Sequence, residues 1–360
     1  MVRILMRYFT KSCSEAFSRS RRAAVLWLVA FLVFTSWNVG GWASLLLSLK
    51  VVKLPDMTGK VVVVTGGNRG IGLAIVRRLA AAGATVVLGS RSLDRGEAAK
   101  AGLPEAARGN VRVLQCDLES LAAVEAFAKA VTQQCPRIDV LVLNAGMCRT
   151  FMDRDGFRLT GDGFEEMMQV NYLSQFHLTQ LLRPALRKAE RPRVLAMTSV
   201  ASASTYPCGI DYASWTTRVP GFWDWVQYGQ SKLANALFMQ QLQEREPSFQ
   251  CVACHPAVAA TELASGAGEG GSLLNRAYSP VVQILAMRGA EDAAVNPLYL
   301  ATTEEFLHPG AVYHPVGRVG WLTHWYQRVC TLQIPCAVNT KHPELWERTE
   351  AILRAKRKGG

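Results

Sequence analysis

Hydrophobic residues follow two different patterns along this chain of 360 residues. Residues 23–49 form a continuous run of 27 residues without a charged side chain. At ~1.5 Å per residue, a helix of this length reaches about 40 Å, more than the roughly 30 Å hydrocarbon core of a bilayer. The apolar part of a cleaved signal peptide runs for only about 7–15 residues. We therefore predict one uncleaved transmembrane helix at 23–49, preceded by a basic segment at 1–22.

From residue 56 onwards, short apolar runs alternate with longer helical patterns. Val61–Val64 is a run of four β-branched residues, as expected for a strand that is buried on both faces. A helical stretch from Leu73 to Ala82 and a second apolar run from Thr85 to Leu88 follow it. This alternation predicts a doubly wound α/β domain over 56–353, with a mainly parallel sheet and helices on both faces. The basic residues at 354–360 form a short tail.

The charge is concentrated at the two ends of the chain. The net charge is +12, but residues 1–22 hold six basic residues against one acidic residue, and residues 354–360 hold four basic residues. The domain between them is therefore nearly neutral, which argues against a nucleic-acid partner and favours a membrane surface or a targeting receptor. The nine cysteines have no repeated short spacing, so we expect reduced thiols and no metal site.

The basic ends leave the compartment open. The final residues, 356–360, read Lys-Arg-Lys-Gly-Gly and resemble a dibasic retrieval signal of the endoplasmic reticulum. The Arg- and Ser-rich start of the chain resembles a mitochondrial presequence instead. We expect a single-pass protein of the endoplasmic reticulum membrane, with a mitochondrial membrane as the alternative. Which side of the membrane holds the α/β domain is open.

A glycine-rich turn joins the first strand to the first helix of this domain. The turn reads Thr-Gly-Gly-Asn-Arg-Gly-Ile-Gly over 65–72. Glycines allow a tight turn and let the backbone approach a ligand closely, while the free N–H groups at the start of a helix bind phosphate. A strand, a glycine turn and a helix in this order predict a dinucleotide site at the turn.

Several motifs make the chain similar to a known family over residues 60–353. The Gly66-x-x-x-Gly70-x-Gly72 spacing, Asn144-Ala145-Gly146 and Tyr228-x-x-x-Lys232 resemble the short-chain dehydrogenase/reductase family, as do Asp117-Leu118, Asn171 and Ser199. Three further stretches resemble its membrane-associated, retinol-dehydrogenase-like branch: 162–165, 231–235 and Leu345-Trp346. The resemblance implies a Rossmann-type sheet of seven strands.

The resemblance also implies catalytic roles for four residues. Tyr228 and Lys232 lie four positions apart on a predicted helix from about Gln227 to Arg245, so they share one face. We expect the Lys232 ammonium, helped by the oxidised nicotinamide, to lower the pKa of Tyr228, which exchanges a proton with the substrate oxygen. Ser199 would orient that oxygen. Asn171 would hold a water molecule that relays protons through Lys232, and Lys232 would also bind the nicotinamide ribose.

The charges near the end of the second strand indicate which cofactor binds. NAD sites commonly place Asp or Glu there, whereas this strand leads into Arg91 and the glycine turn carries Arg69. Two guanidinium groups suit the additional phosphate of NADP, so we predict NADPH. The expected cofactor-binding residues are Gly66, Asn68, Arg69, Gly70, Ile71, Gly72, Arg91, Asp117, Leu118, Asn144, Ala145, Gly146, Tyr228, Lys232, Pro256, Ala259 and Thr261. Ala257 departs from the family by replacing a glycine.

Together these features predict a membrane-anchored NADP-dependent oxidoreductase. We expect it to reduce a lipophilic aldehyde or ketone that is retinal-, polyprenal- or steroid-like. Aromatic residues between Ser199 and Tyr228 either cover such a substrate or belong to the core or to a homo-oligomer contact. The alternatives are an NAD(P)-dependent dehydrogenase that oxidises retinol or a hydroxysteroid, and a catalytically idle module that binds the cofactor and a partner protein.

Overall fold

The computed structural model describes the α/β part of the chain. It covers residues 54–149, 156–203, 205, 209–256, 289–304, 307–308, 310–313 and 343–358. All of them belong to one compact unit, Val51–Gly360. Within these ranges, no helix combines the length and the apolar character that crossing a bilayer requires. The predicted anchor at 23–49 lies outside the described residues.

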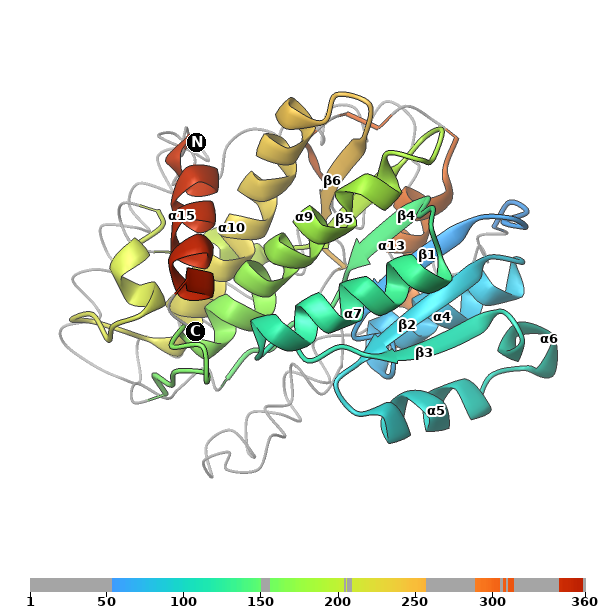
Figure 1. Ribbon diagram of the computed structural model, residues 1–360, viewed down its shortest axis with the longest axis horizontal. Helices are drawn as coiled ribbons and strands as arrows, with labels where there is room; N and C mark the ends of the chain where they lie inside the picture. Colours follow the sequence, from blue (N-terminus) through green and yellow to red (C-terminus); the bar gives the residue numbers. More distant parts are fainter. Residues whose placement is uncertain are drawn as a thin grey trace, which may run out of the picture. The chain divides into compact units, whose positions relative to one another are not determined.

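A seven-stranded sheet forms the centre of this unit (Figure 1). The strand order is β3-β2-β1-β4-β5-β6-β7, and every neighbouring pair is parallel. The chain therefore runs outwards from β1 to β3 and returns to the other side of β1 as β4. In such sheets, ligands bind beyond the carboxyl ends of the strands at this reversal. The strands are β1 Val61–Thr65, β2 Thr85–Ser90, β3 Val111–Gln115, β4 Val140–Leu143, β5 Arg193–Met197, β6 Gln250–Cys254 and β7 Val312–Tyr313.

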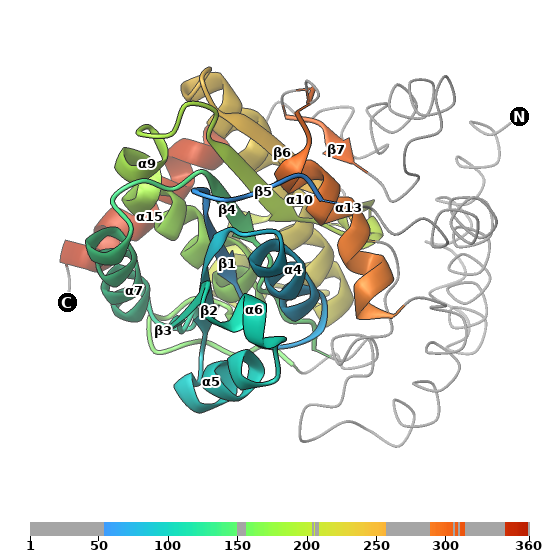
Figure 2. The ribbon, with the colours of Figure 1, turned by 90° about the vertical axis from the view of Figure 1, so that its right-hand side faces the viewer.

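Helices cover both faces of the sheet, as the alternating pattern predicted (Figure 2). One face packs against α4 (Gly70–Ala81), α6 (Glu105–Arg108) and α13 (Ala290–Thr302). The other face packs against α7, α9, α10 and α15. The bounds of these and the remaining helical segments are α5 Leu93–Ala101, α7 Leu121–Gln134, α8 Glu166–Met168, the π turn η1 Gln169–Leu173, α9 Ser174–Leu186, the 3₁₀ turns η2 Val200–Ala203 and η3 Tyr212–Trp215, α10 Asp224–Arg245, and α15 Glu344–Lys358.

Burial on both faces explains the unbroken valine run of β1. Val62 and Val64 pack into the core on the α4 side, while Val63 packs into the core on the α9 side. All three side chains have no solvent exposure. Successive side chains of a strand point to opposite faces, so a strand between two helical layers needs an apolar residue at each position.

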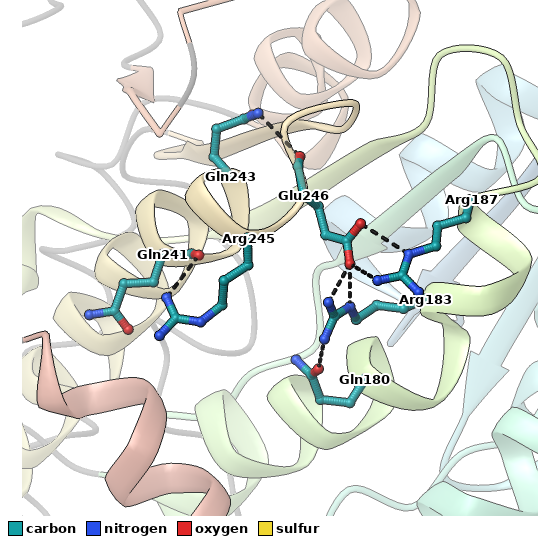
Figure 3. Close-up of polar contacts among 7 residues, drawn as sticks. All are labelled: Gln180, Arg183, Arg187, Gln241, Gln243, Arg245 and Glu246. Atoms are coloured by element: carbon teal, nitrogen blue, oxygen red, sulfur yellow. Dashed lines mark hydrogen bonds and ion pairs between the residues drawn. The ribbon is translucent and has the colours of Figure 1, made fainter.

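Ion pairs join the far ends of α9 and α10, the two helices whose near ends carry the candidate site. Glu246, which follows α10, accepts hydrogen bonds from Arg183 and Arg187 of α9 (Figure 3). The Arg183 Nε to Glu246 Oε1 distance is 2.8 Å. Burial alone would raise the pKa of Glu246, but hydrogen bonds from Arg187 and Arg183 lower it below its ordinary value. The two helices are thus fixed to each other away from the site.

Candidate active site

The glycine turn has the backbone shape that the sequence predicted. Gly66 and Gly70 adopt φ values of +65° and +54°, which favour glycine. A Cβ on Gly72 would lie 2.3 Å from the carbonyl oxygen of Gly66, so a side chain there would collide with the turn. Asn144, directly after β4, donates its Nδ2 to the carbonyl oxygens of Thr65 at 2.9 Å and of Gly66 at 3.2 Å. The turn is therefore fixed from both β1 and β4.

The first turn of α4 fits an anionic group. Arg69 precedes the helix in extended conformation, no side chain caps the first turn, and this turn contains no acidic residue. The N–H groups at the start of the helix and its dipole favour a negative charge at this point. Asn68 lies in the glycine turn before α4, and Ile71 lies in the first turn of α4. This geometry suits the pyrophosphate of a dinucleotide.

A buried polar network connects the glycine turn to α9. Thr65 Oγ1 accepts a hydrogen bond from the Ala145 N–H at 3.0 Å and donates to Gln175 Oε1 at 3.1 Å. Gln175 Nε2 in turn donates to the carbonyl oxygen of Ala145 at 2.7 Å. Three elements, β1, β4 and α9, therefore hold one another in register at the predicted site.

Asn171 lies at the centre of the π turn η1, which separates the short helix α8 from α9. Its Oδ1 accepts from the Met147 N–H at 2.7 Å, and its Nδ2 donates to the Met147 carbonyl oxygen at 2.9 Å and to Ser231 Oγ at 3.0 Å. Single π turns in α-helices are frequent at functional sites. A Cβ on Gly146 would lie 3.3 Å from Asn171 Oδ1 and 3.0 Å from Lys232 Nζ, so this glycine gives both side chains room.

The structure brings Ser199, Tyr228 and Lys232 together. Ser199 lies beside Tyr228 and acts on its phenol as a hydrogen-bonding neighbour that lowers the pKa. Lys232 lies one helical turn after Tyr228 on α10, and its Nζ is 5.6 Å from the centroid of the Tyr228 ring. Its Nζ also donates to the carbonyl oxygen of Met197 at the end of β5, at 3.1 Å. Of the three residues, only Ser199 is partly exposed.

The pKa of Tyr228 is shifted in the opposite direction from our expectation. Burial raises it well above its ordinary value, and the hydrogen bond from Ser199 only partly opposes this. Our expectation of a lowered pKa concerned Tyr228 beside both Lys232 and the bound oxidised nicotinamide, and it stays a prediction for that state. Burial also disfavours the charged form of Lys232 and lowers its pKa to about 8. Without a bound cofactor, Tyr228 is therefore a protonated phenol, and Lys232 can gain or lose a proton close to neutral pH.

Apolar side chains surround the Tyr228 ring. Met167, Ala201 and Trp225 form a small buried cluster with it, and Met147, Cys148 and Trp223 pack against this cluster. The Trp225 and Tyr228 ring centroids are 5.7 Å apart. Trp215, another aromatic residue between Ser199 and Tyr228, belongs to the main core, where it packs against Tyr172. The aromatic residues between Ser199 and Tyr228 therefore lie partly at the site and partly in the core.

The second corner of the predicted cofactor site lies after β2 and β3. Arg91 forms an ion pair with Glu119, with 2.5 Å between Nη1 and Oε1. Asp117 Oδ1 accepts from the Glu119 N–H at 3.0 Å, and the buried Leu118 accepts from Ser174 Oγ through its carbonyl oxygen at 2.7 Å. Pro256 follows β6 and is half-buried. Ala257, Ala259 and Thr261 lie outside the described residues.

Three buried polar residues near the site did not emerge from the sequence as functional residues. Gln175 joins the glycine turn to α9, Glu165 accepts hydrogen bonds at the start of α8, and Asn235 reaches the carbonyl oxygen of Asn171. All three side chains have no solvent exposure. For Glu165 and Asn235, the sequence signal was that they end the stretches 162–165 and 231–235, which resemble the retinol-dehydrogenase-like branch. For Gln175, the signal was its spacing of four residues after Asn171.

Comparisons with known proteins agree with this geometry. A family model described as short chain dehydrogenase matches residues 60–224. Dehydrogenase/reductase SDR family member 13 from Homo sapiens is 35% identical over 272 residues, which cover 73% of this chain and 69% of that protein. Retinol dehydrogenase 13 from Homo sapiens is 34% identical over 258 residues, which cover 71% of this chain and 76% of that protein.

Solved structures show the same fold. A crystal structure of a protein from Mycobacterium Paratuberculosis has a TM-score of 0.55 and 31% identity, and the match covers 72% of this chain and 82% of that one. A short-chain dehydrogenase from Shigella flexneri, complexed with NADP, has a TM-score of 0.57 and 20% identity. That match covers 73% of this chain and 99% of the other and reports on the fold alone.

Proposed function

This chain belongs to the short-chain dehydrogenase/reductase family, and from that premise we propose that it is a membrane-anchored NADPH-dependent reductase of lipophilic aldehydes or ketones. The observation that carries the proposal is the placement of Ser199 and Lys232 beside Tyr228, at the same end of the sheet as the glycine turn. The substrate that we propose is retinal-, polyprenal- or steroid-like.

The side chains of the site carry out the proton transfer of this reaction. A bound nicotinamide cofactor supplies the hydride that adds to the carbonyl carbon. Tyr228 donates its phenolic proton to the carbonyl oxygen, which becomes the alcohol. Its raised pKa keeps that proton in place until the oxygen becomes basic. Ser199 orients the same oxygen, and Lys232 provides a nearby proton source because its pKa is lowered to about 8.

NADPH is the cofactor that we propose, because of the charges after β2. This strand ends at the buried Ser90 and leads directly into Arg91, so no carboxylate stands where one would favour the free ribose hydroxyl of NAD. Arg91 is paired with Glu119, but the arginine side chain is 66% exposed. An exposed ion pair of this kind contributes about 0–1 kcal/mol. A phosphate group can therefore replace Glu119 as the partner of Arg91.

The apolar surroundings of Tyr228 support a lipophilic substrate. Trp225, Met167 and Ala201 are buried beside the phenol. One relative at 34% identity is named a retinol dehydrogenase, which is compatible with a retinoid-like substrate. The uncharged run at 23–49 is the basis for proposing a single-pass membrane anchor, in the endoplasmic reticulum or alternatively in a mitochondrial membrane. We also propose that the protein forms a homo-oligomer.

The test is NADPH consumption by the detergent-solubilised full chain with long-chain aldehydes, retinal, polyprenals and ketosteroids. Tyr228→Phe removes the proton donor and should lower kcat by about 10²–10⁴-fold, with NADPH affinity almost unchanged. Tyr313→Phe is the matched control, because it removes a buried hydroxyl that binds the His308 N–H at the edge of the sheet, away from the site. It should retain the activity of the natural protein.

Each other outcome supports a different function. Tighter binding of NADPH than of NADH is expected, and the reverse order would contradict the proposed cofactor. Turnover of retinol or a hydroxysteroid with the oxidised cofactor, but none of the carbonyl compounds, would identify a dehydrogenase. NADPH binding without turnover of any substrate would favour a cofactor-binding interaction module.

A further inference from the structure

The inward-facing side of α10 carries a buried side-chain amide, Asn235, which contacts both the π turn η1 and the end of β5. It lies seven residues after Tyr228 and three after Lys232, with no solvent exposure. Its Nδ2 donates to the carbonyl oxygen of Asn171 at 3.0 Å and to the carbonyl oxygen of Met197 at 3.3 Å. One side chain of α10 therefore reaches the π turn and the end of β5 together.

The direction of these hydrogen bonds is determined by their acceptors. Carbonyl oxygens only accept, so the nitrogen of the Asn235 amide must face both of them. Its Oδ1 has no hydrogen-bond partner among the described residues. A buried acceptor without a partner costs about 1–3 kcal/mol, and a leucine of similar size would avoid that cost. The two donated bonds are thus the feature that distinguishes asparagine from an apolar residue here.

Both carbonyl oxygens also bind other residues of the site. The Asn171 oxygen accepts from Gln175 Nε2 at 3.1 Å as well, so its two lone pairs already have protein donors. The Met197 oxygen accepts from Lys232 Nζ at 3.1 Å. The water molecule that we expect Asn171 to hold would have to share these lone pairs if it bound to the carbonyl oxygen. The Asn171 carbonyl therefore serves primarily to connect α9 with α10.

We propose that Asn235 is a positioning residue, whose two hydrogen bonds hold the Asn171 turn and the end of β5 in place against the helix that carries Tyr228 and Lys232. The expected effect of this role on turnover rests on the proposed function. Ser199 follows Met197 by two residues, so the position of β5 determines how Ser199 meets Tyr228. A displacement of about 1 Å between reacting groups is enough to lower turnover by about 100-fold.

The test compares Asn235→Leu with the matched control Gln243→Leu in the full chain. Gln243 is another side-chain amide of α10 that binds a strand backbone, since its Oε1 accepts from the Cys251 N–H at 2.9 Å (Figure 3 shows its place on the helix). It lies eight residues further along, about 12 Å from Asn235 along the helix axis. Both variants lose hydrogen bonds between α10 and a strand, but only one loses them at the site.

Asn235→Leu should lower kcat by about 10–100-fold, measured well below its melting temperature, while KM and the affinity for NADPH change by less than about threefold. Gln243→Leu should retain kcat within about twofold of the natural protein. If Asn235→Leu does not fold, Asn235→Ala replaces it, with the same expectation. Equal kcat values for the Asn235 and Gln243 variants would overturn the proposal.

Hydrogen exchange separates this inference from the proposed reaction. Peptides that cover 169–175 and 193–199 should exchange their amide hydrogens faster in Asn235→Leu than in the natural protein or in Gln243→Leu. This readout needs no substrate. If the natural protein turns over no carbonyl compound but this difference is present, the proposed reaction is wrong and the positioning role holds. If the exchange is unchanged, Asn235 does not position these segments.

Discussion

Glu165 is a carboxylate without solvent exposure close to the site. It accepts from the N–H groups of Met167 at 3.1 Å and of Met168 at 2.8 Å at the start of α8, and from Gln227 Nε2 at 3.0 Å. Burial raises its pKa from 4.5 to about 7, because these three hydrogen bonds compensate only in part for the lost hydration. Since Gln227 directly precedes Tyr228, Glu165 links α8 with the catalytic helix.

We predict that this residue makes the stability of the protein depend on pH. A carboxyl group whose pKa is raised by folding stabilises the folded state fully below its unfolded pKa, and this contribution is lost as the pH rises through the folded pKa. Between about pH 4.5 and 7 the loss amounts to roughly 3 kcal/mol, from a shift of about 2.5 pKa units. Glu165→Gln does not ionise and should lack this loss.

Chemical denaturation at pH 5 and pH 8 measures this difference. The unfolding free energy of Glu165→Gln relative to the natural protein should rise between these two pH values. Taking the difference cancels the contributions of other titrating groups, such as His177, whose pKa is lowered by burial. The exposed Glu97→Gln serves as the control and should show no such trend. A difference that is independent of pH for Glu165→Gln would show that Glu165 ionises normally.

At the residue scale, the sequence indicated the side chains to which we assign the chemistry more directly than those that hold them in place. Tyr228 and Lys232 were predictable because their spacing places both on one helical face, and the structure brings them together with Ser199. Asn235 and Gln175 act through contacts with residues up to 110 positions away along the chain. No local pattern marks such a pair. The direction of the Tyr228 pKa shift also depended on burial, which the sequence does not show.

At the scale of elements, the π turn at Asn171 interrupts the helical run from α8 to α9. Its wider turn is seen in the hydrogen bond from the Ser174 N–H to the Gln169 carbonyl oxygen, five residues back. The site requires this shape, because the Asn171 side chain binds the Met147 backbone while its carbonyl oxygen faces α10. A π turn has nearly the same apolar spacing as an α-helix, so the sequence could not reveal it.

The C-terminal helix α15 packs beside α10 over the catalytic helices (Figure 1). Its buried face consists of Leu345, Trp346, Thr349 and Leu353, at helical spacing. Trp346 lies 4.8 Å from Phe176 of α9 between ring centroids, and the Arg245 guanidinium carbon lies 4.4 Å from the Trp346 centroid. This helix therefore completes the core on the side of the sheet that carries the site.

We predict that α15 contributes substantially to stability through Trp346. Trp346→Ala removes a buried indole and should reduce the unfolding free energy by about 3–5 kcal/mol. Arg354→Ala on the same helix is the control. Its side chain is 72% exposed and, among the described residues, pairs only with Glu350, so the change should stay within about 0.5 kcal/mol. Urea unfolding measures both, and equal effects would show that α15 adds little to the core.

At the scale of the whole molecule, the doubly wound sheet was the most predictable feature. Strand β1 coincides with the valine run, and the glycine turn follows it at the point where the strand order reverses. The alternation of buried strands with amphipathic helices leaves few topologies open, because crossovers between parallel strands are right-handed. The buried core of the described residues begins at Met57 and ends at Leu353, while α15 continues to Lys358, beyond the predicted limit of 353.

The uncharged run at 23–49 leads to the last prediction, which concerns where the chain resides. If this run spans a bilayer, the full chain expressed in cells should stay in the membrane pellet after extraction with alkaline carbonate. The double variant Leu32→Arg/Phe34→Arg places two charges near the centre of the run, at a cost of about 5–7 kcal/mol for insertion, and should move to the supernatant. The apolar exchange Leu32→Val/Phe34→Leu should behave like the natural chain. Release of the natural chain by carbonate would show a peripheral protein.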